Sequence, residues 1–173
     1  DGVAILDRVV AAATEIVDEV IILGRSHGSV RSVSEPEPRL GPLNAIAFGM
    51  QACPSDLVAV IAGDHPWIQP GLLSLLIARI GQHDAVVPID RTGRAQPLVA
   101  VYHSRMAQQM SDAVSQGERS ISRFVESIDA NWVTPEEWEQ ADPGGLSFLD
   151  IDTHDDIERH TRGSHLRTDD TTS

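Results

Sequence analysis

The sequence LVAVIAGDHP, at residues 57–66, places an acid and a proline directly after an unbroken apolar run. Runs of this kind, rich in branched side chains and without polar alternation, are typical of strands buried on both faces of a parallel sheet. Two further runs have the same character, VIILG at residues 20–24 and DAVVP at residues 84–88. The three runs therefore predict a sheet that is covered by helices on both faces.

Apolar residues at helical spacing separate these runs, at residues 4–17, 43–53 and 72–80. The turn cluster DRTGR at residues 90–94 is followed by QPLVAVY at residues 96–102, a pattern that predicts a hairpin or an antiparallel strand. Regular alternation of strands and helices indicates a layered α/β fold. We therefore expect a mostly parallel sheet with one antiparallel strand.

The C-terminal part of the chain continues with shorter elements. We expect a single domain over residues 1–162 and a disordered polar tail over residues 163–173, where apolar periodicity is absent. The sequence LDID at residues 149–152 predicts the end of a final strand, on which Asp150 and Asp152 share one face. The other expected elements are helices at 104–115, at 120–128, from 134 onward and at 153–162, and an edge strand at 132–133.

The composition excludes several classes of function. The formal net charge of the 173 residues is −13, and all 13 basic residues are arginines. Without lysine, the chain can form neither a Schiff base nor a P-loop phosphate contact of the usual kind. The acidic balance argues against a nucleic-acid partner, and no apolar run is long enough to cross a membrane. The single cysteine, Cys53, suits a reducing cytoplasm.

Four segments place glycine or polar residues where a parallel sheet binds ligands, in the crevice beyond the carboxyl ends of its strands. Gly41 permits close approach of a ligand to the backbone, and the helix after it presents free N–H groups to an anion. Asp64 directly follows the most apolar strand. Asp150 and Asp152 would hold like charges together, which favours a cation or a hydrogen-bonded ligand. The four segments are residues 39–44, 62–66, 94–97 and 150–152.

Each segment also has a purely structural interpretation. A Gly-Pro pair before a helix often only ends a loop and begins the helix. Asp64 can be a turn residue, and Asp150 with Asp152 can cap the last helix. The four segments in this order are more specific than any one of them.

Together, these segments resemble the molybdenum cofactor guanylyltransferases, the MobA-like branch of the Rossmann-like nucleotidyltransferases. The family's G-P-L-A-G helix start is similar to GPLNA at residues 41–45, and its strand–D–x–P pattern is matched at residues 64–66. Its Q-P-L strand is matched at residues 96–98 and its G-E-R helix start at residues 117–119. The resemblance implies a three-layer, Rossmann-like nucleotidyltransferase fold.

The chain also departs from the family pattern. The closing N-x-N-T motif is replaced by DIDT at residues 150–153, and Glu35 stands where the family usually has an aspartate. The family's first strand and its glycine-rich phosphate loop have no counterpart in these 173 residues. We therefore expect the fold without that strand and loop, and little or no catalysis by this chain alone.

The resemblance implies transfer of GMP from GTP to molybdopterin, with Mg²⁺ as cofactor, GTP and molybdopterin as substrates, and weak contacts with molybdoenzymes or other cofactor-assembly proteins. Asp64 would be the catalytic residue and the metal ligand. Two alternatives stay open, a CTP-using or sugar-phosphate nucleotidyltransferase of the same fold and a non-catalytic binding domain. The residues that the resemblance places around the substrates are Glu35, Gly41, Pro42, Leu43, Asn44, Gln96, Pro97, Asp150 and Asp152.

Overall fold

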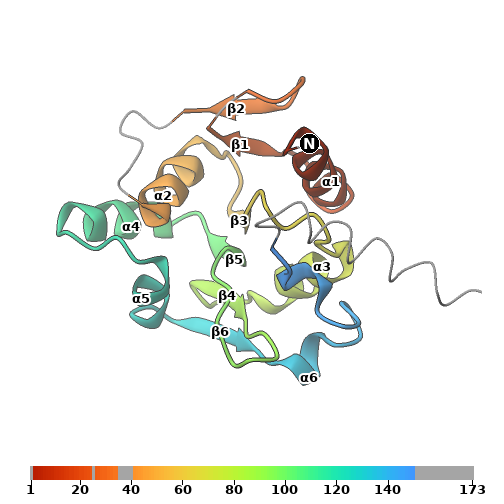
Figure 1. Cartoon of the computed structure of the whole chain (residues 1–173). Coiled ribbons are helices and arrows are strands. Elements are labelled where there is room, and N and C mark those ends of the chain that lie inside the picture. The colour runs from red at the N-terminus through yellow and green to blue at the C-terminus, as the bar shows by residue number, and fades with distance from the viewer. Residues whose placement is uncertain (1, 25, 35–40, 151–173) are drawn as a thin grey trace, which may run out of the picture.

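The computed structural model describes residues 2–24, 26–34 and 41–150. None of the helices in these ranges is long and apolar enough to cross a membrane. In chain order (Figure 1), the elements are α1 (Gly2–Thr14), β1 (Ile21–Leu23), β2 (Arg31–Val33), α2 (Pro42–Ala52), β3 (Leu57–Ile61), α3 (Pro70–Arg79), β4 (Ala85–Pro88), β5 (Val99–His103), α4 (Met106–Ser115), α5 (Ile121–Glu126), β6 (Ala130–Val133), α6 (Pro135–Trp138) and a 3₁₀ turn, η1 (Leu146–Phe148).

The main sheet has four strands in the order β3-β5-β4-β6. Strand β5 runs antiparallel to both of its neighbours, whereas β4 and β6 pair in parallel. Strands β3, β4 and β6 therefore share one direction, and only β5 opposes them. This arrangement confirms the expected mostly parallel sheet with one antiparallel strand. Strands β1 and β2 form a separate parallel pair.

Two hydrophobic clusters cover the two faces of the main sheet. Ala85 and Val87 of β4 point into the cluster built by α2, α4 and α5, and Val86 between them points into the cluster of α1, α3 and α6. Figure 1 shows these two groups of helices on opposite sides of the strands. Because helices cover both faces, all four residues of β4 are buried, as its unbroken apolar sequence predicts.

The helices begin where the sequence provides starting signals. Pro42, Pro70 and Pro135 each occupy the first turn of a helix, where the missing N–H group costs no hydrogen bond. Thr134 and Glu137 form a capping box at the start of α6. The expected helix and strand positions from residue 2 to residue 138 are confirmed to within a few residues at their ends.

Two features differ from the sequence-based expectation. Strand β2 is not predicted by its sequence RSV, which carries no apolar run. The predicted end of a final strand is wrong at Leu149 and Asp150, which lie in no strand and follow the 3₁₀ turn η1; residues 151 and 152 lie outside the described residues. The left-handed backbone of Gly145 (φ 68°) and the 3₁₀ turn after it interrupt extended backbone just before Leu149. The expected helix at 153–162 and tail at 163–173 lie outside the described residues.

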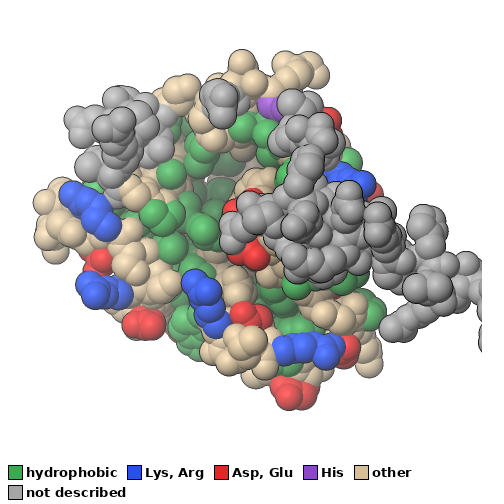
Figure 2. All heavy atoms as spheres, viewed as in Figure 1, with side chains coloured by type: hydrophobic (Ala, Val, Ile, Leu, Met, Phe, Trp, Pro, Cys, Tyr) green, Lys and Arg blue, Asp and Glu red, His purple; other side chains and the backbone are tan. Residues whose placement is uncertain are grey.

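An apolar cavity of about 320 Å³ lies between β1 and β3. Helices α1 and α2 close its two sides, and its lining residues are all apolar side chains or glycine, with Cys53 among them. Figure 2 shows hydrophobic side chains around this hollow. Strand β3 is the edge of its sheet, so within the described ranges its outer backbone groups face the cavity side without a strand partner.

Candidate functional site

Asp64 lies in the turn that follows β3. The end of the strand is held by a backbone hydrogen bond of 2.8 Å from the N–H of Ala62 to the carbonyl of Leu98. Because β3 and β4 run in the same direction, the turn after β3 and the turn after β4 lie at the same end of the sheet, where these strands have their carboxyl ends. The side chain of Asp64 is 55% exposed, so its carboxylate can reach a ligand.

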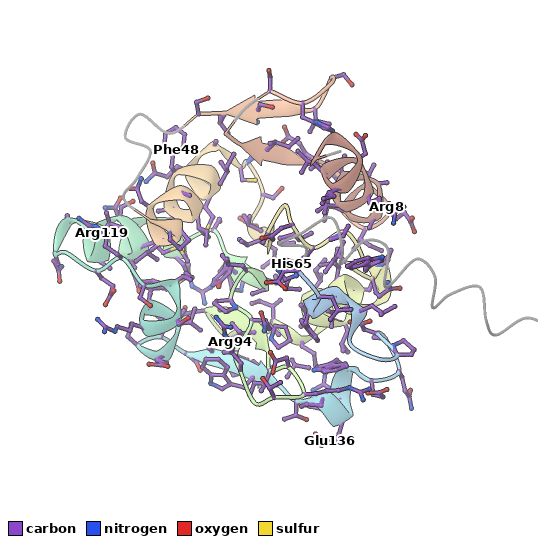
Figure 3. The ribbon with its side chains drawn as sticks, viewed as in Figure 1. Arg8, Phe48, His65, Arg94, Arg119 and Glu136 are labelled. Atoms are coloured by element: carbon purple, nitrogen blue, oxygen red, sulfur yellow. The ribbon has the colours of Figure 1, made fainter. Side chains whose placement is uncertain are left out.

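His65 anchors the Asp64 turn to a distant loop. Its side chain is only 10% exposed, and its Nδ1 lies 2.8 Å from the backbone carbonyl of Ser147. The hydroxyl of Ser147 accepts a hydrogen bond of 2.9 Å from the N–H of Gln69, at the start of α3. Figure 3 shows His65 near the centre of the view, next to η1. Loop 142–149 therefore contacts both ends of the segment that follows Asp64, at His65 and at Gln69.

Asp142 in turn holds that loop. Its side chain is fully buried, and its two carboxylate oxygens accept hydrogen bonds of 3.0 Å from the N–H groups of Leu146 and Ser147. These bonds satisfy the buried charge, which would otherwise be very costly. The link between this loop and His65 is not predicted by the sequence, because residues 82 positions apart carry no local signal of their contact.

Gly41 brings the start of α2 against the residues 117–119. Its backbone has φ 90°, and a side chain on it would place a Cβ 3.2 Å from the carbonyl oxygen of Arg119. The G-P-L motif at residues 41–43 and the G-E-R motif at residues 117–119, which both carry the family resemblance, therefore lie in contact. Leu43 is fully buried in the core, so it can meet a ligand only through its backbone; Pro42 is exposed and Asn44 is half-buried.

Replacement of Gly41 by alanine should lower the free energy of unfolding by about 1–3 kcal/mol, since both the left-handed backbone and the contact with Arg119 oppose a side chain. Urea unfolding measures the change. Gly93→Ala is the matched control, because Gly93 has φ 85° and open space around it. An equal loss in both variants would show that the Arg119 contact contributes nothing.

Asp90 organises the turn after β4. Its Oδ1 accepts hydrogen bonds from the backbone N–H groups of Thr92 (2.8 Å) and Arg94 (3.0 Å) and from the Thr92 hydroxyl (2.6 Å). Its Oδ2 accepts one of 2.6 Å from the Gln96 side chain. Gln96 is therefore held within the turn, and Pro97 is buried with its carbonyl bonded to the Tyr102 hydroxyl. The side chain of Arg94 is exposed.

Asp90 should make the free energy of unfolding depend on pH. Its slight burial raises its pKa, but the hydrogen bonds from Thr92, Arg94 and Gln96 outweigh burial and bring the pKa below 3.8. A depressed pKa stabilises the fold above the unfolded-state value and loses this contribution as the pH falls through the folded-state value. The stability gap between the wild type and Asp90→Asn should therefore be largest near neutral pH and shrink below pH 3.8.

Urea unfolding at several pH values tests this expectation. Asp18→Asn, which changes an exposed aspartate in the loop after α1, corrects for the general effect of removing one acid. A gap between Asp90→Asn and the wild type that stays constant down to about pH 3 would contradict the role of Asp90.

The cavity is lined by two of the four candidate segments and by Leu98, which adjoins a third. Pro42, Gly63 and Leu98 all line it, and each belongs to or adjoins a residue expected at the site. Asp150 is exposed, three residues after Ser147. Glu35 and Asp152 lie outside the described residues. Among residues 2–24, 26–34 and 41–150, no group of three His, Cys, Asp or Glu side chains could hold a metal ion by itself.

The chain matches known proteins over most of its length. A family model described as a MobA-like NTP transferase domain matches residues 1–132. The chain belongs to the MobA-like NTP transferase family. One MobA-like relative, a probable molybdenum cofactor guanylyltransferase from Chloroflexus aggregans, is 32% identical over 166 residues, which cover 91% of this chain and 79% of the relative.

Solved structures show that other MobA-like and related proteins share this fold. The molybdopterin-guanine dinucleotide biosynthesis protein A from Archaeoglobus fulgidus superposes with a TM-score of 0.77 at 20% identity, covering 92% of this chain and 85% of that one. A 2-C-methyl-D-erythritol 4-phosphate cytidylyltransferase from Thermus thermophilus gives 0.69 at 14% identity, with 94% and 89% covered. The expected nucleotidyltransferase fold is thereby confirmed.

Proposed function

We propose that this protein transfers GMP from GTP to the phosphate of molybdopterin and releases pyrophosphate. The phosphate oxygen of molybdopterin forms a bond to the α-phosphorus of GTP as the bond to pyrophosphate breaks. The observation that carries the proposal is the position of Asp64 at the carboxyl end of β3, in a MobA-like chain whose relatives are named guanylyltransferases. The roles proposed below for the other residues are assigned relative to Asp64.

Asp64 would hold Mg²⁺. The chemistry of the donor fits, because the carboxylate is a hard oxygen ligand, is half exposed, and makes no bidentate ion pair with an arginine among the described residues. When bound, Mg²⁺ supplies charge neutralisation at the phosphates. A cation is needed here, because the chain carries a net charge of −13 and its substrates are anions.

The remaining residues would bind and orient the substrates. Gly41 and Leu43 would present their backbone N–H groups at the start of α2 to the nucleotide. Pro42, which has no N–H, and Asn44, whose N–H is bonded to the Gly41 carbonyl (3.2 Å), would lie beside it. The exposed Arg94, whose backbone N–H is held by Asp90, would contact a phosphate. Glu35, Pro97, Asp150 and Asp152 would complete the surroundings of the two substrates.

We further propose that the cavity between β1 and β3 accepts one more extended strand, the first strand that the family resemblance implies. Both faces of such a strand would be covered, by α1 and by α2, so it should be apolar throughout. The glycine-rich loop that follows this strand in the family would supply most of the phosphate contacts. For this reason the 173 residues alone should be poorly active.

A transfer assay with Mg²⁺, molybdopterin and either GTP or CTP tests the proposed function, on the protein in a form that carries a phosphate-binding loop. Formation of the guanylyl product from GTP, with little reaction from CTP, is the expected result. Preference for CTP would favour the cytidylyl alternative, and binding without turnover would favour a non-catalytic domain. We place the activity in the cytoplasm, with molybdoenzymes or other cofactor-assembly proteins as weak partners.

A further inference from the structure

We propose that His65 is a second ligand to a transition-metal ion, such as Co²⁺, bound at Asp64, and that loop 142–149 orients it for this role. The proposal rests on the proposed function only in placing a divalent cation at Asp64. It begins with two side chains on adjacent residues, since the Nε2 of His65 lies 3.6 Å from the Oδ1 of Asp64. The rest of the histidine is buried.

The hydrogen bond to Ser147 decides which ring nitrogen of His65 carries the proton. A backbone carbonyl can only accept, so the Nδ1 at 2.8 Å from the Ser147 oxygen is the N–H donor. In the neutral ring, the lone pair then sits on Nε2, the atom that faces Asp64. Two acceptors turned toward each other repel unless a cation lies between them.

The spacing of the two donors fits a shared ion. Metal bonds to imidazole nitrogen and carboxylate oxygen are about 2.0–2.2 Å long, so donors up to about 4 Å apart can bind one ion. The observed 3.6 Å satisfies this condition. The side chain of His65 is 10% exposed, so the ring is not sealed from solvent.

The support behind His65 is the kind that metal-binding histidines have. Such a histidine typically donates its second ring N–H to a carboxylate or a backbone carbonyl, which fixes the ring. Here the carbonyl belongs to Ser147, whose own N–H is held by the buried Asp142 and whose hydroxyl is held by Gln69. The ring of His65 is therefore fixed before any ion binds.

The donor pair has a consequence for the choice of metal. Mg²⁺ prefers oxygen ligands, whereas imidazole nitrogen favours transition metals. With one oxygen and one nitrogen from the protein, the site should bind Mg²⁺ through Asp64 alone and gain affinity for ions such as Co²⁺ through His65. Water and phosphate oxygens would supply the remaining ligands.

The test uses Co²⁺ and Mg²⁺ as probes on the 173-residue chain, with NMR of the histidine rings and calorimetry. We expect the ring of His65 to show a protonated Nδ1 and a bare Nε2, and its signals to respond to Co²⁺. His65→Asn keeps a donor toward Ser147 but removes Nε2, and should weaken Co²⁺ binding about tenfold with little effect on Mg²⁺. His83→Asn, which alters a histidine beside Asp129 on the surface, is the matched control and should change neither affinity at Asp64.

Ring signals of His65 that ignore Co²⁺ in the wild type would overturn the proposal, and this measurement needs no variant to fold. Unchanged Co²⁺ affinity in His65→Asn would also overturn it. The two proposals fail separately. A Co²⁺ contact at His65 without GMP transfer by the loop-carrying protein would support this proposal and reject the proposed function. GMP transfer without a Co²⁺ contact at His65 would support the proposed function and reject this proposal.

Discussion

Replacement of Asp64 by alanine should lower Mg²⁺-dependent GMP transfer by about 1,000-fold, a barrier increase of ~4 kcal/mol, in a form of the protein that carries a phosphate-binding loop. The physical reason is that the Asp64 carboxylate would be the charged protein ligand to the cation. Its side chain is half exposed, so the substitution leaves no cavity in the core and the fold should be unchanged. Steady-state kinetics over a Mg²⁺ series measures the effect.

Asp56→Ala is the control for this prediction. Asp56 is exposed and directly precedes β3, at the opposite end of the strand from Asp64. Its replacement should leave the rate within about twofold of the wild type, as is usual for surface substitutions of small energetic effect. If Asp64→Ala retained more than about a tenth of the activity, a change below ~1.4 kcal/mol, the assignment of the metal ligand to Asp64 would be lost.

The 173-residue chain alone should bind GTP with a dissociation constant of about a millimolar or weaker, near −4 kcal/mol. Only the start of α2, the cation at Asp64 and Arg94 would hold the nucleotide, and the contacts of a glycine-rich loop would be missing. Calorimetry with GTP and Mg²⁺ measures the affinity, and inorganic pyrophosphate tests whether the phosphates alone account for it.

Extension of the protein by a strand and a glycine-rich loop should strengthen this binding to about a micromolar dissociation constant, near −8 kcal/mol. Asp64→Ala in the extended form separates the contribution of the cation from that of the loop. Micromolar GTP binding by the 173 residues alone would contradict the idea that the loop supplies most of the phosphate contacts.

The fold could be predicted from local patterns because most of its strands have unbroken apolar sequences. The run before Asp64 has no polar alternation, and such a sequence is stable only as a covered strand. The same run predicts that Asp64 lies in the crevice beyond the carboxyl ends of the strands, where such sheets bind ligands. Strand β2 escaped prediction, since the pairing of Arg31, Ser32 and Val33 with β1 depends on tertiary contacts and not on sequence pattern.

The supports of the site were harder to foresee. The contact of His65 with Ser147 joins residues that are far apart in the chain, and nothing in either local sequence marks it. The expected strand is absent at Leu149 and Asp150 for a related reason, because the turn at Gly145 and the bonds of Asp142 to its own loop replace extended backbone just before them. Asp90 did have a local signal, since an aspartate two residues before a threonine in a turn often accepts its N–H.

In the part of the chain that the structure describes, the outer edge of β3 has no strand partner, and this has a consequence for handling the protein. An apolar strand with free N–H and C=O groups is a template on which a second molecule can add its own strand, which is how many chains begin to aggregate. The net charge of −13 keeps neighbouring molecules apart at low ionic strength, and added salt shortens the range of that repulsion. The 173-residue chain should therefore stay monodisperse in dilute buffer and self-associate as salt is added, and a strand seated in the cavity should remove this tendency.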